Sequence, residues 1–255
     1  MKIIRFIASF LIVLGILALM VWAAKKANNK ICTGISIQID SSEKHELLTK
    51  SDILNILEYH NVLWEGKAKN EIDLSSIQKY LTQENYIKSV DKVHFLGSKL
   101  QIEVTLYDIL LEVESNSGQK FLLDVQGTYL PYSPKVGNDV IVASGYIPNT
   151  FRKKEQVNPN EIALFELFTI ASLITENPYY TALFQKLDID SNQNITLFPS
   201  VGNIPVLFGT TQYAQEKFRS LKYMYDEVLP YVNDNMYAQL DVRFKNRIVA
   251  TKNKS

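Results

Sequence analysis

The chain has 255 residues, of which 46% are hydrophobic and 11% aromatic. That is enough apolar material to bury the core of one large domain or two ordinary ones, and it excludes a disordered chain. Lys and Arg together number 27, as do Asp and Glu, so the net charge gives no support for a nucleic-acid partner.

The first predicted element is an apolar helix from Phe6 to Ala24, a stretch without a charged residue. At 1.5 Å per residue its length would be about 28 Å, close to the ~30 Å hydrocarbon core of a bilayer. Eleven of its residues are Leu, Ile, Val or Phe, which together favour insertion by about 3–7 kcal/mol. The segment therefore predicts an uncleaved membrane anchor. The alternative is a cleaved signal peptide, but this apolar stretch is longer than the usual signal-peptide core.

Charge alone does not orient this anchor. Two basic residues precede it and three follow it closely, so the positive-inside rule gives no clear direction. The tail before the helix is too short to be the working end of the protein. We therefore expect residues 1–5 to be a cytoplasmic tip, residues 6–24 the anchor and residues 25–30 a hinge.

A first folded module is predicted over residues 31–107. Its elements, in chain order, are a strand at 31–39, a helix at 50–60, a second helix capped by Asp73, and strands at 87–95 and 99–107. Thr49 and Asp52 have the spacing of a capping box, which marks the start of the first helix. The order β-α-α-β-β allows two helices to cover one face of a three-stranded sheet, with the other face or an edge left free.

A second module is predicted over residues 108–255. Short strands are expected at 109–113, 120–124, 139–142, 183–189, 195–199 and 204–208. A mostly buried helix, capped by Asn158, runs to Ile174, and a second helix covers residues 212–229. One long strand closes the chain, with one face formed by Ala238, Leu240, Val242 and Phe244.

The sequence contains no recognisable catalytic, metal-binding or nucleotide-binding motif. The histidines lack the spacing of a metal site, and there is no G-x-S-x-G elbow or phosphate-binding glycine fingerprint. Residues 188–199 start like a calcium loop, but Gln193 replaces the required Gly and Pro199 replaces the bidentate Glu. We therefore expect a non-enzymatic binding protein without cofactor or metal, which recruits partner strands at its sheet edges.

Three stretches carry a family resemblance. They are Ile72-Asp-Leu-Ser-Ser-Ile-Gln-Lys-Tyr-Leu81 with the strands up to Val104, then Leu197-Phe-Pro-Ser-Val-Gly-Asn-Ile-Pro-Val-Leu-Phe-Gly209 with the helix around Leu221–Tyr225, and Leu240-Asp-Val-Arg-Phe244. In this order they resemble the FtsQ/DivIB family of bacterial cell-division proteins. The first is similar to the second helix and strand pair of the family's POTRA domain. The third is similar to its near-terminal I/V-D-L-R-Y/F strand. The family's Q-R-x-P-I junction between the domains is replaced here by Leu106-Tyr-Asp-Ile-Leu110.

The resemblance implies an α+β fold: a single N-terminal transmembrane helix, a β-α-α-β-β POTRA domain at 31–107, and a C-terminal mixed β-sheet domain with helices at 108–255. It implies a non-enzymatic divisome scaffold that links early and late division proteins. The protein would cross the inner membrane once, with a cytoplasmic N-terminus and periplasmic domains, and concentrate at the septum. Its partners would be FtsB-like and FtsL-like bitopic proteins, with no nucleic acid and no small-molecule ligand.

In the family, a partner adds a strand to the C-terminal edge of the β domain. Carried onto this chain, the implied partner-binding residues are Tyr237, Arg243, Lys245, Asn246, Arg247, Ile248, Val249 and Ala250. The alternative for Ile248 and Val249 is that they are ordinary core contacts of a closing strand. The alternative for the whole chain is a POTRA-containing periplasmic binding or secretion-assembly protein that is not tied to division.

Overall fold

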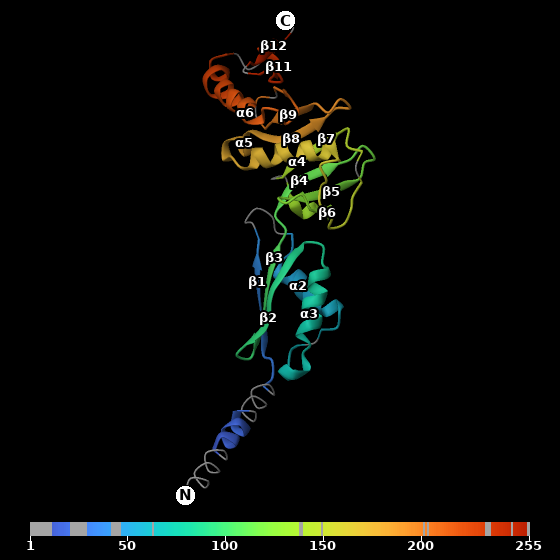
Figure 1. Ribbon diagram of the computed structural model, residues 1–255, viewed down its shortest axis with the longest axis vertical. Helices are drawn as coiled ribbons and strands as arrows, with labels where there is room; N and C mark the ends of the chain where they lie inside the picture. Colours follow the sequence, from blue (N-terminus) through green and yellow to red (C-terminus); the bar gives the residue numbers. More distant parts are fainter. Residues whose placement is uncertain are drawn as a thin grey trace, which may run out of the picture. The chain divides into compact units, whose positions relative to one another are not determined.

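The computed structural model in Figure 1 describes residues 12–20, 30–41, 47–62, 64–137, 140–148, 150–200, 202, 204–232, 236–245 and 247–253. The folded part divides into two compact units, with the boundary between Leu106 and Tyr107.

Only the middle of the predicted anchor is described. Residues 12–20 are helical and their large apolar side chains are exposed. Within the described ranges, no helix combines the length and the apolar character needed to span a membrane. Phe6 and Ala24, the predicted ends of the anchor, lie outside the described residues, as do the expected cytoplasmic tip and most of the hinge.

The first unit confirms the predicted β-α-α-β-β order. It contains β1 (Gly34–Asp40), α2 (Lys50–Tyr59), α3 (Leu74–Gln83), β2 (Ile87–Leu96) and β3 (Lys99–Leu106), with the short 3-10 turn η1 (Lys69–Glu71) before α3. The strand order is β1-β3-β2, with β1 parallel and β2 antiparallel to β3. Figure 1 shows both α-helices on one side of this sheet.

Local chemistry explains where these helices begin. The Thr49 side chain accepts a hydrogen bond from the Asp52 backbone N–H at 3.2 Å, and Asp52 Oδ2 accepts one from the Thr49 N–H at 2.8 Å, which completes the capping box. Asp73 caps α3 by accepting from the backbone of Ser75 and Ser76. Side chains of β3 alternate, so its apolar residues are buried beneath the helices and its polar residues face away.

The described part of the second unit forms a nine-stranded mixed sheet, in the order β12-β11-β10-β9-β8-β7-β4-β5-β6. The strands are β4 (Ile109–Glu114), β5 (Lys120–Asp124), β6 (Tyr129–Pro131), β7 (Ile141–Gly145), β8 (Phe184–Ile189), β9 (Ile195–Pro199), β10 (Val206–Gly209), β11 (Tyr237–Asp241) and β12 (Val249–Lys252). The pairs β4–β7, β7–β8 and β10–β11 are parallel, and the remaining neighbours are antiparallel.

Helices supply the other half of this core. They are α4 (Ile162–Thr175), α5 (Pro178–Leu183) and α6 (Ala214–Tyr223), with short turns at η2 (Pro134–Val136) and η4 (Leu229–Tyr231). The π-helical turn η3 (Met224–Val228) continues α6. Buried residues of α4, such as Leu164, Leu167 and Ile170, join one apolar cluster with strand residues such as Leu187 and Leu197.

The start of α4 was predicted wrongly. The helix begins at Ile162 rather than after Asn158, because the preceding residues form a turn of their own. In it, Asn158 Oδ1 accepts from the Asn160 N–H at 2.9 Å, and the Glu161 carboxylate accepts from the Asn158 N–H at 2.7 Å. The sequence also gave no indication of α5, which Asn177 caps.

The prediction of the closing strand was wrong in the strand's length and in part of its pattern of buried side chains. It stops at Asp241, whose Oδ1 accepts a hydrogen bond from the Arg243 N–H at 3.0 Å and so bends the backbone into a turn. Val242 is still buried, but Phe244 is 48% exposed instead of lying on the core face. The chain then returns as a separate strand, β12, antiparallel to β11.

Candidate partner-binding edge

Strand β12 forms one edge of the C-terminal sheet, and the register shows which of its amides are free to pair. On the inner side of β11, the Leu240 and Val242 N–H groups donate to carbonyls at the β10 side, both at 3.0 Å. Because N–H groups alternate along a strand, residues 239 and 241 of β11 direct their backbone groups toward β12. Their partners are Thr251 and Val249, so these amides face inward.

The same alternation points the N–H and C=O groups of Ala250 and Lys252 away from β11. These groups lie on the open side of the last strand in the sheet, which Figure 1 places at the red end of the chain. An exposed row of this kind can template a further strand. Four residues, Val249–Lys252, make up this edge strand.

A groove lies beside the edge strand. Its volume is about 520 Å³, and it is lined from α6, from the π-helical turn and from the segment before β12 by Arg219, Ser220, Tyr223, Met224, Val228, Arg247 and Ile248. Ile248 and Ala250 are partly buried against the core on this face, whereas Val249 is 44% exposed. A π-helical turn shifts helical register locally and is often found where a helix serves a function.

The structure brings most of the expected partner-binding residues to this edge. Val249 and Ala250 lie in β12, Ile248 and Arg247 line the groove, and Tyr237 begins the neighbouring strand β11. Of the two residues for which a core contact was the alternative, Ile248 packs against the core, whereas Val249 is on the surface. Asn246 lies outside the described residues.

Two of the expected residues instead hold the turn that leads into β12. Arg243 donates to Asp241 through Nε at 3.0 Å and through Nη2 at 2.6 Å. Asp241 is only 7% exposed, and these hydrogen bonds lower the pKa of its carboxyl group below the usual range, against the effect of burial. The Lys245 ammonium lies 4.9 Å from the ring centroid of Tyr213, which joins the same turn to the start of α6.

The opposite edge of the sheet is closed. The outward backbone groups of Tyr129 in β6 are both bonded to a strap formed by residues 152–157: the Tyr129 N–H donates to the Glu155 carbonyl at 2.8 Å, and the Lys154 N–H donates to the Tyr129 carbonyl at 3.0 Å. The next outward position of β6 is Pro131, which has no N–H. Of the two edges of this sheet in the part of the chain that the structure describes, β12 is therefore the one whose outward backbone groups are not bonded to such a strap.

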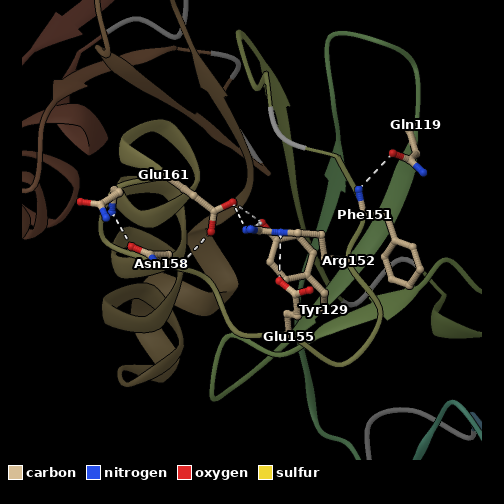
Figure 2. A network of polar contacts seen from close by, with 8 residues as sticks. Gln119, Tyr129, Phe151, Arg152, Glu155, Asn158 and Glu161 are labelled. Carbon is tan, nitrogen blue, oxygen red and sulfur yellow. Dashed lines mark hydrogen bonds and ion pairs between the residues drawn. The ribbon is translucent and has the colours of Figure 1, made fainter.

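Figure 2 shows what fastens the strap. The Tyr129 hydroxyl donates to Glu161 Oε1 at 2.8 Å, and the Arg152 guanidinium also donates to that oxygen. The guanidinium carbon lies 5.2 Å from the ring centroid of Tyr129. Burial, together with the hydrogen bond to Glu161, raises the pKa of Tyr129 to about 12, so the hydroxyl remains a donor at physiological pH.

Sequence reasoning missed the groove residues on α6 and the strap. Arg219, Tyr223 and Met224 belong to a helix that was predicted, but a π-helical turn has no sequence signature. The strap depends on Tyr129, Arg152 and Glu161, which are separated along the chain and form no motif. Among the residues that the structure describes, no cluster of three or more His, Cys, Asp and Glu side chains is arranged to hold a metal ion.

Two family models match the chain, one over each of the two units. A family model described as FtsQ/DivIB, C-terminal related, matches residues 110–251, and a POTRA-like domain model matches residues 30–105. No individual curated protein matches the chain. Since the first match covers more than half of the sequence, the chain belongs to the FtsQ/DivIB family of bacterial cell-division proteins.

Proposed function

We propose that this protein is a scaffold of the bacterial division machinery and that it binds FtsB-like and FtsL-like partners by strand addition to β12. The observation that carries the proposal is the open edge, where the backbone groups of Ala250 and Lys252 point away from the sheet. The family is one of non-enzymatic division proteins, and we propose that this member also acts without catalysis or cofactor.

The edge and groove together define the partner. A partner residue paired beside Ala250 would place its side chain on the same face of the sheet as Ala250, toward the groove. Ala250 is small, so it leaves room for a large apolar side chain above Met224, Val228 and Ile248. Arg219 and Arg247 line the same groove, so an acidic residue nearby would complement its charge.

The membrane topology is part of the proposal. The segment from Phe6 to Ala24 would cross the inner membrane once, with residues 1–5 in the cytoplasm and the two folded units in the periplasm. Large apolar side chains exposed all along residues 12–20 support a lipid environment for this helix, since a row of this kind is costly in water. Recruitment to the septum would then follow from contacts of the folded units with other single-pass division proteins.

The test of function replaces one edge amide. Ala250→Pro removes an outward N–H, and an edge strand tolerates proline at such a position. Proline at Val249 would be a poor choice because that N–H faces β11. In cells depleted of the native protein, the Ala250→Pro full-length chain should fail to restore septation and leave filaments. Ala250→Ser, which keeps the N–H and nearly the same side-chain size, is the matched control and should restore division.

Two results would refute the proposal in whole or in part. One is normal septation in depleted cells, which would remove the division role altogether. The other is full complementation by an Ala250→Pro protein that also captures its partners as the native protein does. The second result would leave the family assignment intact but rule out strand addition at β12.

A further inference from the structure

A buried lysine connects α6 to the end of β10. Lys217 is 8% exposed, and its ammonium donates to the Phe208 carbonyl at 2.9 Å and to the Thr210 carbonyl at 2.8 Å. It also lies 4.8 Å from the ring centroid of Phe208. Burial lowers the pKa of Lys217, whereas the carboxylates of Glu166 and Asp241 raise it. A buried charge is costly unless it is well bonded, so its presence here calls for a role.

The lysine is part of a wider set of contacts around the end of β10. From α4, Glu166 accepts hydrogen bonds from the Thr211 N–H at 2.6 Å and from the Thr211 hydroxyl at 3.0 Å. Gly209 has a φ of +74°, and a Cβ built on it would lie 2.9 Å from Cγ of Arg243. The segment after β10 is therefore fixed from both helices, and it forms the surface on which the Arg243 side chain rests.

These contacts lead directly to the candidate partner-binding edge. Arg243 is bonded to Asp241, and this pair shapes the turn from which the chain returns as β12. Lys217 also lines a small pocket with residues of that turn, including Val242, Phe244 and Arg247. A shift of the β10 end would thus move the support of the turn, and the edge strand would move with it.

We propose that Lys217 is a positioning residue for partner binding: by holding the Phe208 and Thr210 carbonyls it fixes the support of Arg243 and keeps β12 in the register that accepts a partner strand. This inference rests on the proposed function. It adds a residue that does not touch the partner and that acts through the turn leading into β12.

The test compares two variants of the second unit in the full-length protein. Lys217→Met keeps the aliphatic stem but leaves two carbonyls without their donor. We expect hydrogen exchange at the Val249 and Thr251 amides to accelerate about tenfold, exchange at Leu187 in β8 to stay unchanged, and affinity for the purified FtsB-like partner to fall about tenfold. Ile141→Val, a core change in β7 away from the end of β10, should lower overall stability while the affinity stays native.

Each outcome either supports or refutes the positioning role of Lys217. Native affinity in a folded Lys217→Met protein would overturn the positioning role, and so would equal losses of affinity in the two variants. If Lys217→Met fails to fold, Glu166→Gln perturbs the same end of β10 from α4, and it should accelerate exchange in β12 and weaken binding about threefold; native values would refute the inference. Native affinity in Ala250→Pro would instead rule out strand addition at β12, and the inference would fall with it.

Discussion

The turn between β11 and β12 offers the sharpest prediction of local stability. Asp241 receives three hydrogen bonds from Arg243, through its backbone N–H, Nε and Nη2. Asp241→Asn keeps the shape and one acceptor oxygen but removes the negative charge. Hydrogen bonds to charged groups contribute ~1.5–3 kcal/mol each, but the Arg243 side chain is 42% exposed and solvent weakens the pair. We therefore expect the free energy of local opening of β12 to fall by about 1.5 kcal/mol.

A loss of that size corresponds to about a tenfold increase in local opening. Hydrogen exchange in the full-length protein is the assay, read at the inward amides of Val249 and Thr251, with Leu187 in β8 as the internal reference. Only the edge strand should lose protection. Unchanged exchange in β12, or equal loss throughout the sheet, would show that the Asp241–Arg243 pair does not hold the turn.

The same pair predicts a pH dependence. Because Arg243 lowers the folded-state pKa of Asp241 below its ordinary value of 3.8, its contribution is fully present above that value and is lost as pH falls through the folded-state pKa. In the native protein, β12 should therefore open selectively only below about pH 4. In Asp241→Asn this acid-dependent step should be absent, and its persistence would contradict the assignment.

Three further changes test other parts of the fold. Glu161→Gln weakens the fastening of the strap on β6 and should accelerate exchange at the Tyr129 amide several-fold while β12 is unaffected; an unchanged Tyr129 amide would count against the strap. Gly209→Ala places a Cβ against Arg243 at a positive φ and should lower the free energy of unfolding of the second unit by about 1–2 kcal/mol, measured by denaturant unfolding. An unchanged free energy would refute the close approach. Thr49→Ala removes one side of the capping box and should lower the free energy of unfolding of the first unit by about 1 kcal/mol, measured by Trp64 fluorescence. A change near zero would mean that the cap does not contribute to stability.

The first unit was accessible from sequence because its signals are local. Thr49 with Asp52, and Asp73 with the residues after it, satisfy the first turn of each helix from within a few residues. In β3, strict alternation at Leu100, Ile102 and Val104 indicates a strand with one covered face. Neither signal depends on distant parts of the chain, so the order of elements could be read directly.

The second unit departed from prediction where distant residues decide the local structure. Glu161 ends the approach to α4 because it is bonded to Tyr129 and Arg152, which a helix-start pattern cannot anticipate. The alternation through Leu240, Val242 and Phe244 continues past the true end of β11, because Asp241 binds Arg243 instead of continuing the strand. Hydrophobic periodicity has no means of marking such a turn.

The candidate site was only partly predictable for a related reason. Family resemblance placed it after Phe244, and Val249 and Ala250 do lie in the edge strand. Which amides face outward depends on the register of β12 with β11, and the sequence alone does not determine that register. The groove beside the edge requires α6 to lie next to Ile248, a contact between residues far apart in sequence.

The measurement that tests strand addition most directly is hydrogen exchange of β12 in the full-length protein, with and without a saturating FtsB-like partner. If the partner adds a strand, the outward amides of Ala250 and Lys252 should become strongly protected, while the inward amides of Val249 and Thr251, already bonded to β11, should change much less. Exchange at Ala250 and Lys252 that stays as fast in the complex as in the free protein would contradict the account.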